Sequence, residues 1–245
     1  RFSLPFFPFL QSKNLYFRSL LTSSCFFTNV EPYIMPSSFT PYAFSPSCST
    51  SVPRYIGLHT SSASWSPISL CVTGEAIDIA IKSARHATKR RKIVSLIKAY
   101  HGHTGLAVAT GDDRFTKFFL SEQDEDFPHV PFNDLAAMEQ ALAGGDVAAV
   151  IMETIPATYG FPLPDPGYLE AVKELCVRHG SLYIADEVQT GLMRTGELWG
   201  ITKHGIEPDI LVTGKGISGG LYPIACVLLG QASGAWLDED GFAHM

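Results

Sequence analysis

The 245-residue sequence has little of what marks a membrane, nucleic-acid-binding or disulfide-rich protein. No apolar run reaches the roughly 18 residues of a membrane-spanning helix. The net charge is -6, so no basic excess indicates nucleic acid or a membrane surface as a partner. The five cysteines form no CxxC pair, and no other spacing is typical of metal ligands. We therefore expect a globular protein with no bound metal, in a reducing compartment such as the cytoplasm or the mitochondrial matrix.

Glu31 is the only acidic residue before residue 69, and this stretch is rich in Ser, Phe, Pro and Thr. Two interpretations of residues 1–68 remain open. An organellar transit segment is Ser-rich, basic and poor in acidic residues. A disordered or mistranslated stretch joined to a genuine domain would have the same composition. Under either interpretation, we expect residues 69–245 alone to form the folded domain.

From residue 69 onward, helical and strand patterns alternate along the chain. Apolar residues recur at helical spacing in residues 74–92, 134–145 and 167–180. Continuously apolar strands are expected in residues 92–100, 147–154, 181–187, 208–216 and 222–230. We expect Asn133 to cap the second helix and Gly180 to end the third. This alternation predicts an α/β domain with a mainly parallel sheet and helices on both faces.

Several of these strands end on residues that can carry chemistry. Ligands of such sheets bind beyond the carboxyl ends of the strands. The residues at those ends are Tyr100, His101, Glu153, Asp186, Glu187 and Lys215. A buried carboxylate is costly unless a partner compensates its charge, so we expect a cationic group to face Asp186.

Lys215 lies in the stretch TGKGISGG, whose glycines let the backbone approach a bulky group closely. A lysine in a water-poor crevice becomes an amine nucleophile that can form a Schiff base. An ordinary loop lysine is the alternative. Asp186 could pair with Lys215 directly, could cap a helix, or could keep the pyridine nitrogen of pyridoxal phosphate protonated. In the last case the planar ring lies between the two residues.

Three stretches together resemble the class III pyridoxal-phosphate-dependent aminotransferases. They are AYHGHTG at residues 99–105, YIADEVQTGLMRTG at 183–196 and PDILVTGKGISGG at 208–220. The family includes ornithine, acetylornithine, 4-aminobutyrate and ω-amine transaminases. The resemblance runs from about residue 71 to the end. It implies the large domain of a fold-type I transferase without its C-terminal small domain, hence a fragment of a homodimer or larger homo-oligomer.

The resemblance also implies roles for individual residues around pyridoxal 5'-phosphate. Lys215 matches the lysine that forms the internal aldimine, and Asp186 matches the partner of the pyridine nitrogen. Val188 matches a residue that packs on one face of the ring, and Gln189 matches one near its phenolic oxygen. Tyr100 stands where the family stacks an aromatic side chain on the other face.

His101 follows Tyr100 in the same motif, and Glu153 matches a glutamate beside the cofactor. Glu187 is expected to serve local structure. The phosphate is expected at the helix start within VTGEAIDIA, because free N–H groups and the helix dipole favour anions there. The candidates are Thr73, Gly74 and Glu75. This loop is one residue shorter than is usual in the family, and an ordinary helix start is the alternative.

His103 and Thr158 depart from the pattern of members that use 2-oxoglutarate. Those members read HGRT, and their arginine binds a substrate carboxylate with two hydrogen bonds. They often carry a glutamate at the position of Thr158. An imidazole lacks the fixed fork of a guanidinium. The sequence therefore favours a pyruvate-using amine transaminase or an unusual diamine enzyme over ornithine or 4-aminobutyrate specificity.

The function implied by the resemblance is transfer of an amino group from an amine or ω-amino acid to a keto acid. Lys215 would alternate as general base and general acid in a ping-pong reaction. Other pyridoxal phosphate chemistry on the same scaffold, by a decarboxylase or aminomutase, stays open. A non-catalytic protein in which Asp186 and Lys215 lie apart is the third alternative, and an inactive fragment of a transaminase also stays open.

Overall fold

The computed structural model describes residues 66–70, 73–121, 125–219 and 221–238. All of them belong to the compact unit Leu58–Met245. The expectations for residues 1–65 lie outside the described residues. Within the described ranges, no helix combines the length and apolarity that a membrane span requires.

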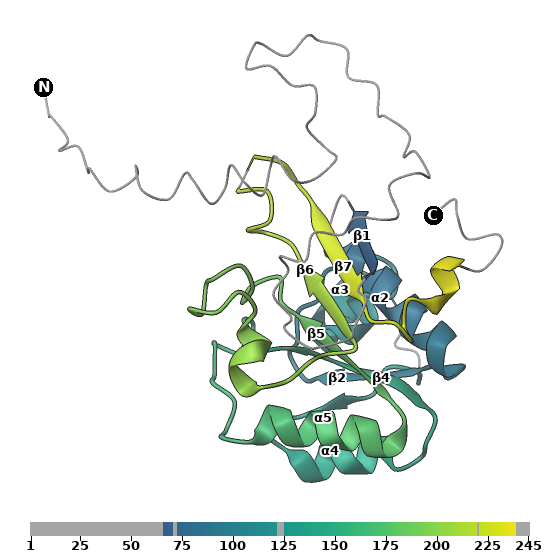
Figure 1. Cartoon of the computed structure of the whole chain (residues 1–245). Helices are drawn as coiled ribbons and strands as arrows, with labels where there is room; N and C mark the ends of the chain where they lie inside the picture. The colour runs from purple at the N-terminus through teal and green to yellow at the C-terminus, as the bar shows by residue number, and fades with distance from the viewer. Residues whose placement is uncertain (1–65, 71–72, 122–124, 220, 239–245) are drawn as a thin grey trace, which may run out of the picture. The chain divides into compact units, whose positions relative to one another are not determined.

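A sheet of seven strands, counted over the described residues, forms the centre of this unit (Figure 1). Its spatial order is β1-β7-β6-β5-β4-β2-β3. The strands are β1 (Ser66–Leu70), β2 (Lys92–Leu96), β3 (His129–Val130), β4 (Val147–Glu153), β5 (Leu182–Asp186), β6 (Ile210–Thr213) and β7 (Ala225–Leu229). From β3 to β6 all neighbours are parallel, whereas β7 runs antiparallel to both β6 and β1. The mainly parallel sheet is confirmed, with an antiparallel edge that the apolar pattern did not indicate.

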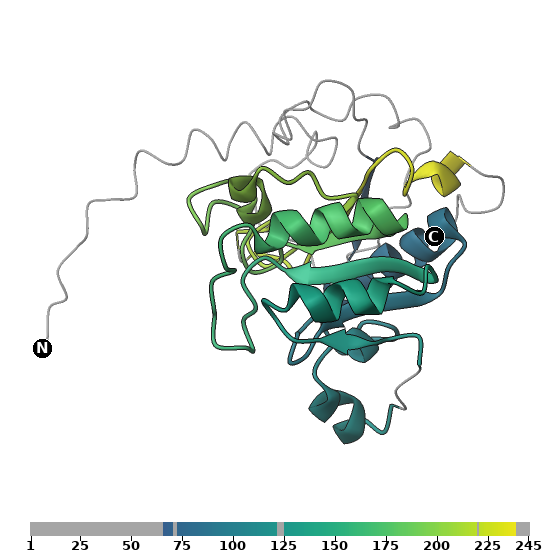
Figure 2. The ribbon, with the colours of Figure 1, turned by 90° about the horizontal axis from the view of Figure 1, so that it is seen from below.

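Helices cover both faces of the sheet, as the alternating pattern predicts. Helix α2 (Thr73–Thr88) packs Ala, Ile and further apolar side chains against one face. Helices α4 (Leu135–Leu142) and α5 (Tyr168–His179) pack against the other face, where Figure 2 shows them in front of the strands. The shorter helices are η2 (Val108–Thr110), α3 (Asp113–Phe118), η3 (Gly200–His204) and η4 (Ala235–Asp238).

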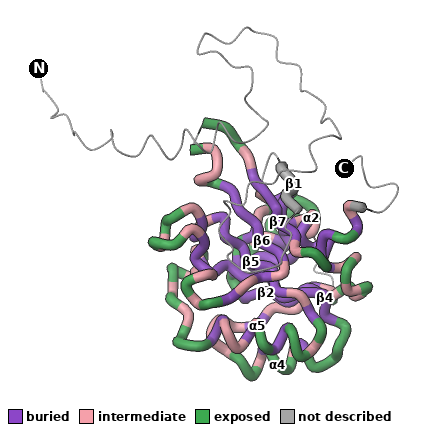
Figure 3. Tube along the Cα trace, viewed as in Figure 1, coloured by how far each residue is buried: buried purple, intermediate pink, exposed green. Residues whose placement is uncertain are grey.

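The central strands are mostly apolar because both of their faces are covered. All seven residues of β4 are buried, and Figure 3 shows the central strands buried while the outer side of α4 is exposed. Strand β2 ends at Leu96, earlier than expected, because the chain turns there. The Ala99 N–H donates to the Leu96 carbonyl at 3.1 Å, and Lys98 has a φ of 63°.

One cap was predicted wrongly. Asp134, not Asn133, caps α4, and its carboxylate accepts a hydrogen bond from the Ala137 N–H at 2.9 Å. Asn133 has a φ of 62° and accepts instead from the Asp165 N–H. Its left-handed backbone places it in the preceding turn, so the next residue occupies the cap position. Gly180 ends α5 as expected, with a φ of 65°.

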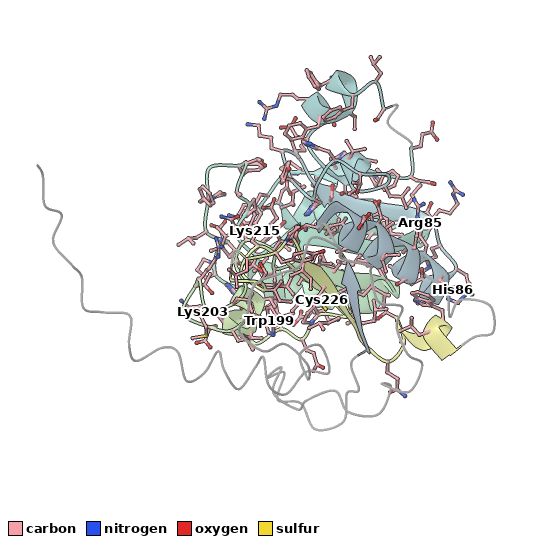
Figure 4. The ribbon with its side chains drawn as sticks, turned by 90° about the horizontal axis from the view of Figure 1, so that it is seen from above. Arg85, His86, Trp199, Lys203, Lys215 and Cys226 are labelled. Carbon is pink, nitrogen blue, oxygen red and sulfur yellow. The ribbon has the colours of Figure 1, made fainter. Side chains whose placement is uncertain are left out.

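The parallel strands bring their carboxyl ends to one edge of the sheet. Glu153 at the end of β4 is in register with Asp186 at the end of β5, and Asp186 is in register with Val212 of β6. Helix α2 starts at this edge and runs toward the opposite one, which it approaches at Arg85 and His86. Figure 4 shows these two residues on the side of the sheet away from Lys215.

Candidate active site

A buried ion pair of His101 and Asp186 lies at the carboxyl edge of the sheet. The Asp186 Oδ2 atom lies 2.7 Å from His101 Nδ1, and both side chains are almost completely buried. The other carboxylate oxygen of Asp186 accepts from the Val188 N–H at 3.0 Å. His101 Nε2 is also buried, and no protein group in the described residues satisfies it. The pair therefore leaves one imidazole nitrogen for a further polar group.

Glu153 is the second carboxylate at this edge, and it is 4% exposed. One oxygen accepts from the Tyr100 N–H at 3.0 Å, and the other accepts from the Ala157 N–H at 3.1 Å. Two strand connections are thereby tied to the end of β4. Glu153 thus fixes the backbone of Tyr100, whose side chain is 38% exposed.

The charges in this cluster shift one another's protonation. Burial disfavours the charged imidazole of His101, but the hydrogen bond that it donates to Asp186 and the charges of Asp186 and Glu153 outweigh this effect, so the pKa of His101 is raised. Burial raises the pKa of Glu153, and the nearby His101 charge opposes this shift in part. The hydrogen bond and the neighbouring charges therefore favour a protonated His101.

Lys215 follows β6 and is exposed, with a φ of 38°. Its amine donates a hydrogen bond to the side-chain oxygen of Gln189, which lies three residues beyond Asp186. Among the described residues no ion pair joins Lys215 to Asp186, whose partners are His101 and Val188. The direct bridge considered from the sequence is therefore not formed. The two residues instead stand at the same edge, linked through the loop that carries Gln189.

The start of α2 packs tightly against the turns that carry these residues. A Cβ atom added to Gly214 would lie 2.9 Å from the hydroxyl oxygen of Thr73. A Cβ atom added to Gly102, whose φ is 105°, would lie 2.9 Å from Cα of Gly74. The residue before Lys215 and the turn after β2 thus both meet the start of α2, where unpaired N–H groups can bind an anion.

Glu75 is exposed in the first turn of α2. Its backbone N–H, rather than its carboxylate, is the group that can contribute to anion binding. Val188 is buried in the core cluster of the α2 face, and Gln189 is half-buried. The roles of both residues beside a cofactor stay predictions.

His103 and Thr158 are exposed, and the structure gives them separate partners. The imidazole of His103 lies among aromatic rings, with centroids 4.5 Å from Phe115, 5.0 Å from Phe119 and 5.1 Å from Tyr100. The Thr158 hydroxyl donates to the Lys98 carbonyl. Neither residue supplies a guanidinium or a carboxylate at its position.

Reasoning from the sequence missed two features of the site. It did not pair His101 with Asp186, which are 85 residues apart. It also missed Thr104, whose hydroxyl would collide with a Cβ atom added to Gly74. The available signal was that His101 and Asp186 follow two strands of one parallel sheet. For Thr104, nothing in the sequence distinguished this threonine from the others.

The comparisons with known proteins agree on one family. The family model described as Aminotransferase class-III matches residues 38–236. An uncharacterised aminotransferase of Archaeoglobus fulgidus is 48% identical over 172 residues, which cover 70% of this chain and 40% of that protein. The mitochondrial ornithine aminotransferase of Rattus norvegicus is 43% identical over 139 residues, which cover 57% of this chain and 32% of that protein. The chain therefore spans less than half the length of these relatives.

Solved structures give the same result for the fold. A transaminase from the marine bacterium Virgibacillus superposes with a TM-score of 0.66 at 30% identity, over 71% of this chain and 43% of that one. A taurine:2-oxoglutarate aminotransferase from Bifidobacterium kashiwanohense, solved in complex with PLP and glutamate, superposes with a TM-score of 0.65 at 29% identity, over 71% of this chain and 44% of that one. The predicted fold class is confirmed for the part of the fold that this chain contains.

Proposed function

The chain belongs to the class III aminotransferases, which depend on pyridoxal phosphate, and we propose from this that it carries the catalytic lysine side of a transaminase. The reaction would move an amino group from an amine or ω-amino acid to a keto acid. One observation supports this most directly. The loop that leaves the buried Asp186 places Gln189 against the amine of Lys215.

The residues at the sheet edge would hold pyridoxal phosphate at both ends of its ring. Asp186 is held by His101 and Val188, yet a carboxylate can accept more hydrogen bonds than these two, so it can also face a protonated pyridine nitrogen. Lys215 is the amine that would hold the aldehyde carbon. The backbone N–H groups at Thr73 and Gly74 would hold the phosphate. Gly214 lies beside them, and a Cβ atom at that position would lie 2.9 Å from the Thr73 hydroxyl oxygen.

When bound, pyridoxal phosphate supplies an electron sink for the carbon that bears the transferred nitrogen. The chain's own residues would hold the ring and move the proton. Asp186 would keep its negative charge against the ring nitrogen, because His101 holds the carboxylate in place from the side. Lys215 would take a proton at Nζ and return it, and its exposed position gives a substrate direct access to that atom.

For the substrate, we propose an amine donor with pyruvate as the acceptor. His103 lies in a ring cluster, and Thr158 is bound to a backbone carbonyl, so neither offers the charged fork that grips a second carboxylate. A panel of amine donors assayed against pyruvate and 2-oxoglutarate tests this. Pyruvate is expected to support the faster reaction, and a strong preference for 2-oxoglutarate would overturn the proposal.

We also propose that the protein forms a homodimer or a larger homo-oligomer. Three consecutive apolar residues are exposed where α3 ends. They are Phe118, the last residue of α3, at 79%, Phe119 at 48% and Leu120 at 90%. A second copy that covered them would remove this apolar area from water. Sedimentation of the purified chain would give the mass, and a monomer at all concentrations would contradict the proposal.

The assignment of Lys215 is tested by absorbance. Purified chain mixed with pyridoxal phosphate is expected to develop a visible band that borohydride removes and fixes to Lys215. Lys215→Ala is expected to abolish the band and reduce transamination at least about a thousandfold. Lys203→Ala, which replaces another exposed lysine, is the matched control and should leave both unchanged. A band of normal intensity in the Lys215 variant would refute the assigned role.

A further inference from the structure

Glu187 is a fully buried carboxylate that receives four hydrogen bonds from three segments of the chain. Its Oε1 atom accepts from the Thr154 hydroxyl at 2.5 Å and from the Ile201 N–H at 2.8 Å. Its Oε2 atom accepts from the Thr190 hydroxyl at 2.8 Å and from the Gly200 N–H at 2.7 Å. The side chain thus ties the end of β4 and the start of η3 to the loop that follows β5.

This arrangement requires a carboxylate. Each oxygen of Glu187 faces one backbone N–H, and a backbone N–H can only donate. A glutamine at this position would set its NH₂ group against one of these donors. Burial raises the pKa of Glu187, whereas the hydrogen bonds from Thr154, Gly200, Thr190 and Ile201 favour the ionised form.

Two glycines let the backbone pass close to Glu187. A Cβ atom added to Gly191 would lie 2.6 Å from the Glu187 carbonyl oxygen. One added to Gly200 would lie 3.4 Å from both carboxylate oxygens of Glu187. The loop between these glycines is closed by the Leu192 N–H, which donates to the Leu198 carbonyl at 2.6 Å. Glu187 therefore sits at the base of a loop whose two ends it holds together.

This loop is the one that contacts the lysine turn. Gln189, two residues after Glu187, accepts the hydrogen bond from Lys215. Farther along the loop, the side chain of Leu192 lies 3.2 Å from the position that a Cβ atom on Gly216 would occupy. Gly216 directly follows Lys215 in the sequence. Whatever fixes the loop therefore also fixes the surroundings of the lysine amine.

We propose that Glu187 is a positioning residue that acts on Lys215 through Gln189. The described hydrogen-bond partners of its carboxylate do not include Lys215. Its four hydrogen bonds set where Gln189 lies, and Gln189 in turn sets where the amine of Lys215 points. This inference rests on the proposed function, since it concerns the readiness of that lysine for pyridoxal phosphate.

A double-mutant cycle separates this role from a general loss of stability. Glu187→Gln and Gln189→Ala are each expected to weaken pyridoxal phosphate binding about tenfold, the equivalent of one hydrogen bond to a charged group. The double variant should bind no more weakly than the weaker single variant, because the second change removes nothing further. The pH midpoint of the visible absorbance should shift equally in both single variants. Effects that multiply, or an unshifted midpoint in Glu187→Gln, would overturn the inference.

A second readout needs no cofactor. Arg194 is exposed in the loop that Glu187 closes, so trypsin can cut after it when the loop opens. Glu187→Gln is expected to accelerate this cut about tenfold. Glu139→Gln, which removes a carboxylate from an exposed ion pair with Arg178, is the matched control and should cut at the original rate. An unchanged rate in Glu187→Gln would show that the carboxylate does not hold the loop.

If Glu187→Gln does not yield folded protein, Thr190→Val replaces it in the cycle. This change removes one hydroxyl donor and leaves both backbone donors. A smaller shift of the pH midpoint, matched in direction by Gln189→Ala, is expected, and no shift would overturn the inference. If wild-type chain develops no band with pyridoxal phosphate while trypsin still distinguishes the variants, the proposed function fails. The role of Glu187 in holding the two ends of the loop together then stands without it.

Discussion

The two ends of the candidate site are built differently. Asp186 is 4% exposed and is fixed by a buried histidine and a backbone N–H. Lys215 is exposed and is held by a single side chain, Gln189. A group that must keep one charge throughout a reaction is served by a rigid, dry setting. A group that must move protons and meet substrates is served by an open one, so the difference follows the division of labour expected of the two residues.

The largest loss of stability should come from breaking the rigid end, which carries Asp186. Asp186→Asn removes the negative charge and leaves the imidazole of His101 buried without its ionic partner. We expect transamination to fall by about 10²–10³-fold and the free energy of unfolding to fall by about 3 kcal/mol. Steady-state kinetics and urea denaturation measure the two quantities.

A surface ion pair of the same length provides the control for Asp186. Asp146 lies 2.7 Å from Lys92, and its side chain is 52% exposed. Asp146→Asn should cost much less stability than Asp186→Asn because water screens the exposed pair. If both variants lose the same stability, burial is not what distinguishes the rigid end.

A smaller loss of unfolding free energy, with a defined pH dependence, is expected from His101→Gln. Folding raises the pKa of His101, so the folded chain keeps a proton that the unfolded chain releases. The stabilisation is complete below the unfolded value of about 6.5 and is lost as the pH rises through the raised value. The loss is at most about 1.4 kcal/mol per pH unit.

His101→Gln cannot show this loss, because glutamine does not titrate. The difference in unfolding free energy between wild type and variant should therefore shrink from pH 6 to pH 9, as measured by denaturation at each pH. Glu153 and Glu187 remain in both proteins, so their own titration largely cancels. A difference that grows with pH would mean that His101 is neutral in the folded chain.

The smallest loss of stability is expected from an exposed ring contact. His103→Ala removes an exposed imidazole from contact with Phe115, Phe119 and Tyr100. Exposed aromatic contacts are worth about 0.5–1 kcal/mol, so the melting temperature should change by only a few degrees. If the loss of stability matched that of His101→Gln, the buried pair would stabilise the fold no more than an exposed ring contact does.

Much of the fold could be predicted because local patterns determine it. Continuous apolar strands alternating with amphipathic helices predict a mainly parallel sheet, and strand ends then place Glu153, Asp186 and Lys215 at one edge. The family resemblance read from three short motifs is confirmed by the match over residues 38–236. The roles given to individual residues stay predictions.

What could not be predicted depends on contacts between distant segments. The His101–Asp186 pair joins residues 85 positions apart. Glu187 accepts hydrogen bonds from backbone N–H groups 13 and 14 positions away. No residue type in the sequence predicts which backbone groups will donate. The wrong cap at Asn133 has a more local cause. Asn and Asp both cap helices, and only the left-handed backbone of Asn133 decides between neighbours.

The antiparallel edge of the sheet has a practical consequence for anyone who shortens this chain. Strand β1, Ser66–Leu70, pairs along the whole of β7, from Ser66 opposite Leu229 to Leu70 opposite Ala225. A fragment that began at residue 71 would leave one row of β7 amide and carbonyl groups without their neighbours. Uncovered strand edges recruit other chains, so such a fragment should precipitate where a fragment that begins before residue 66 stays in solution.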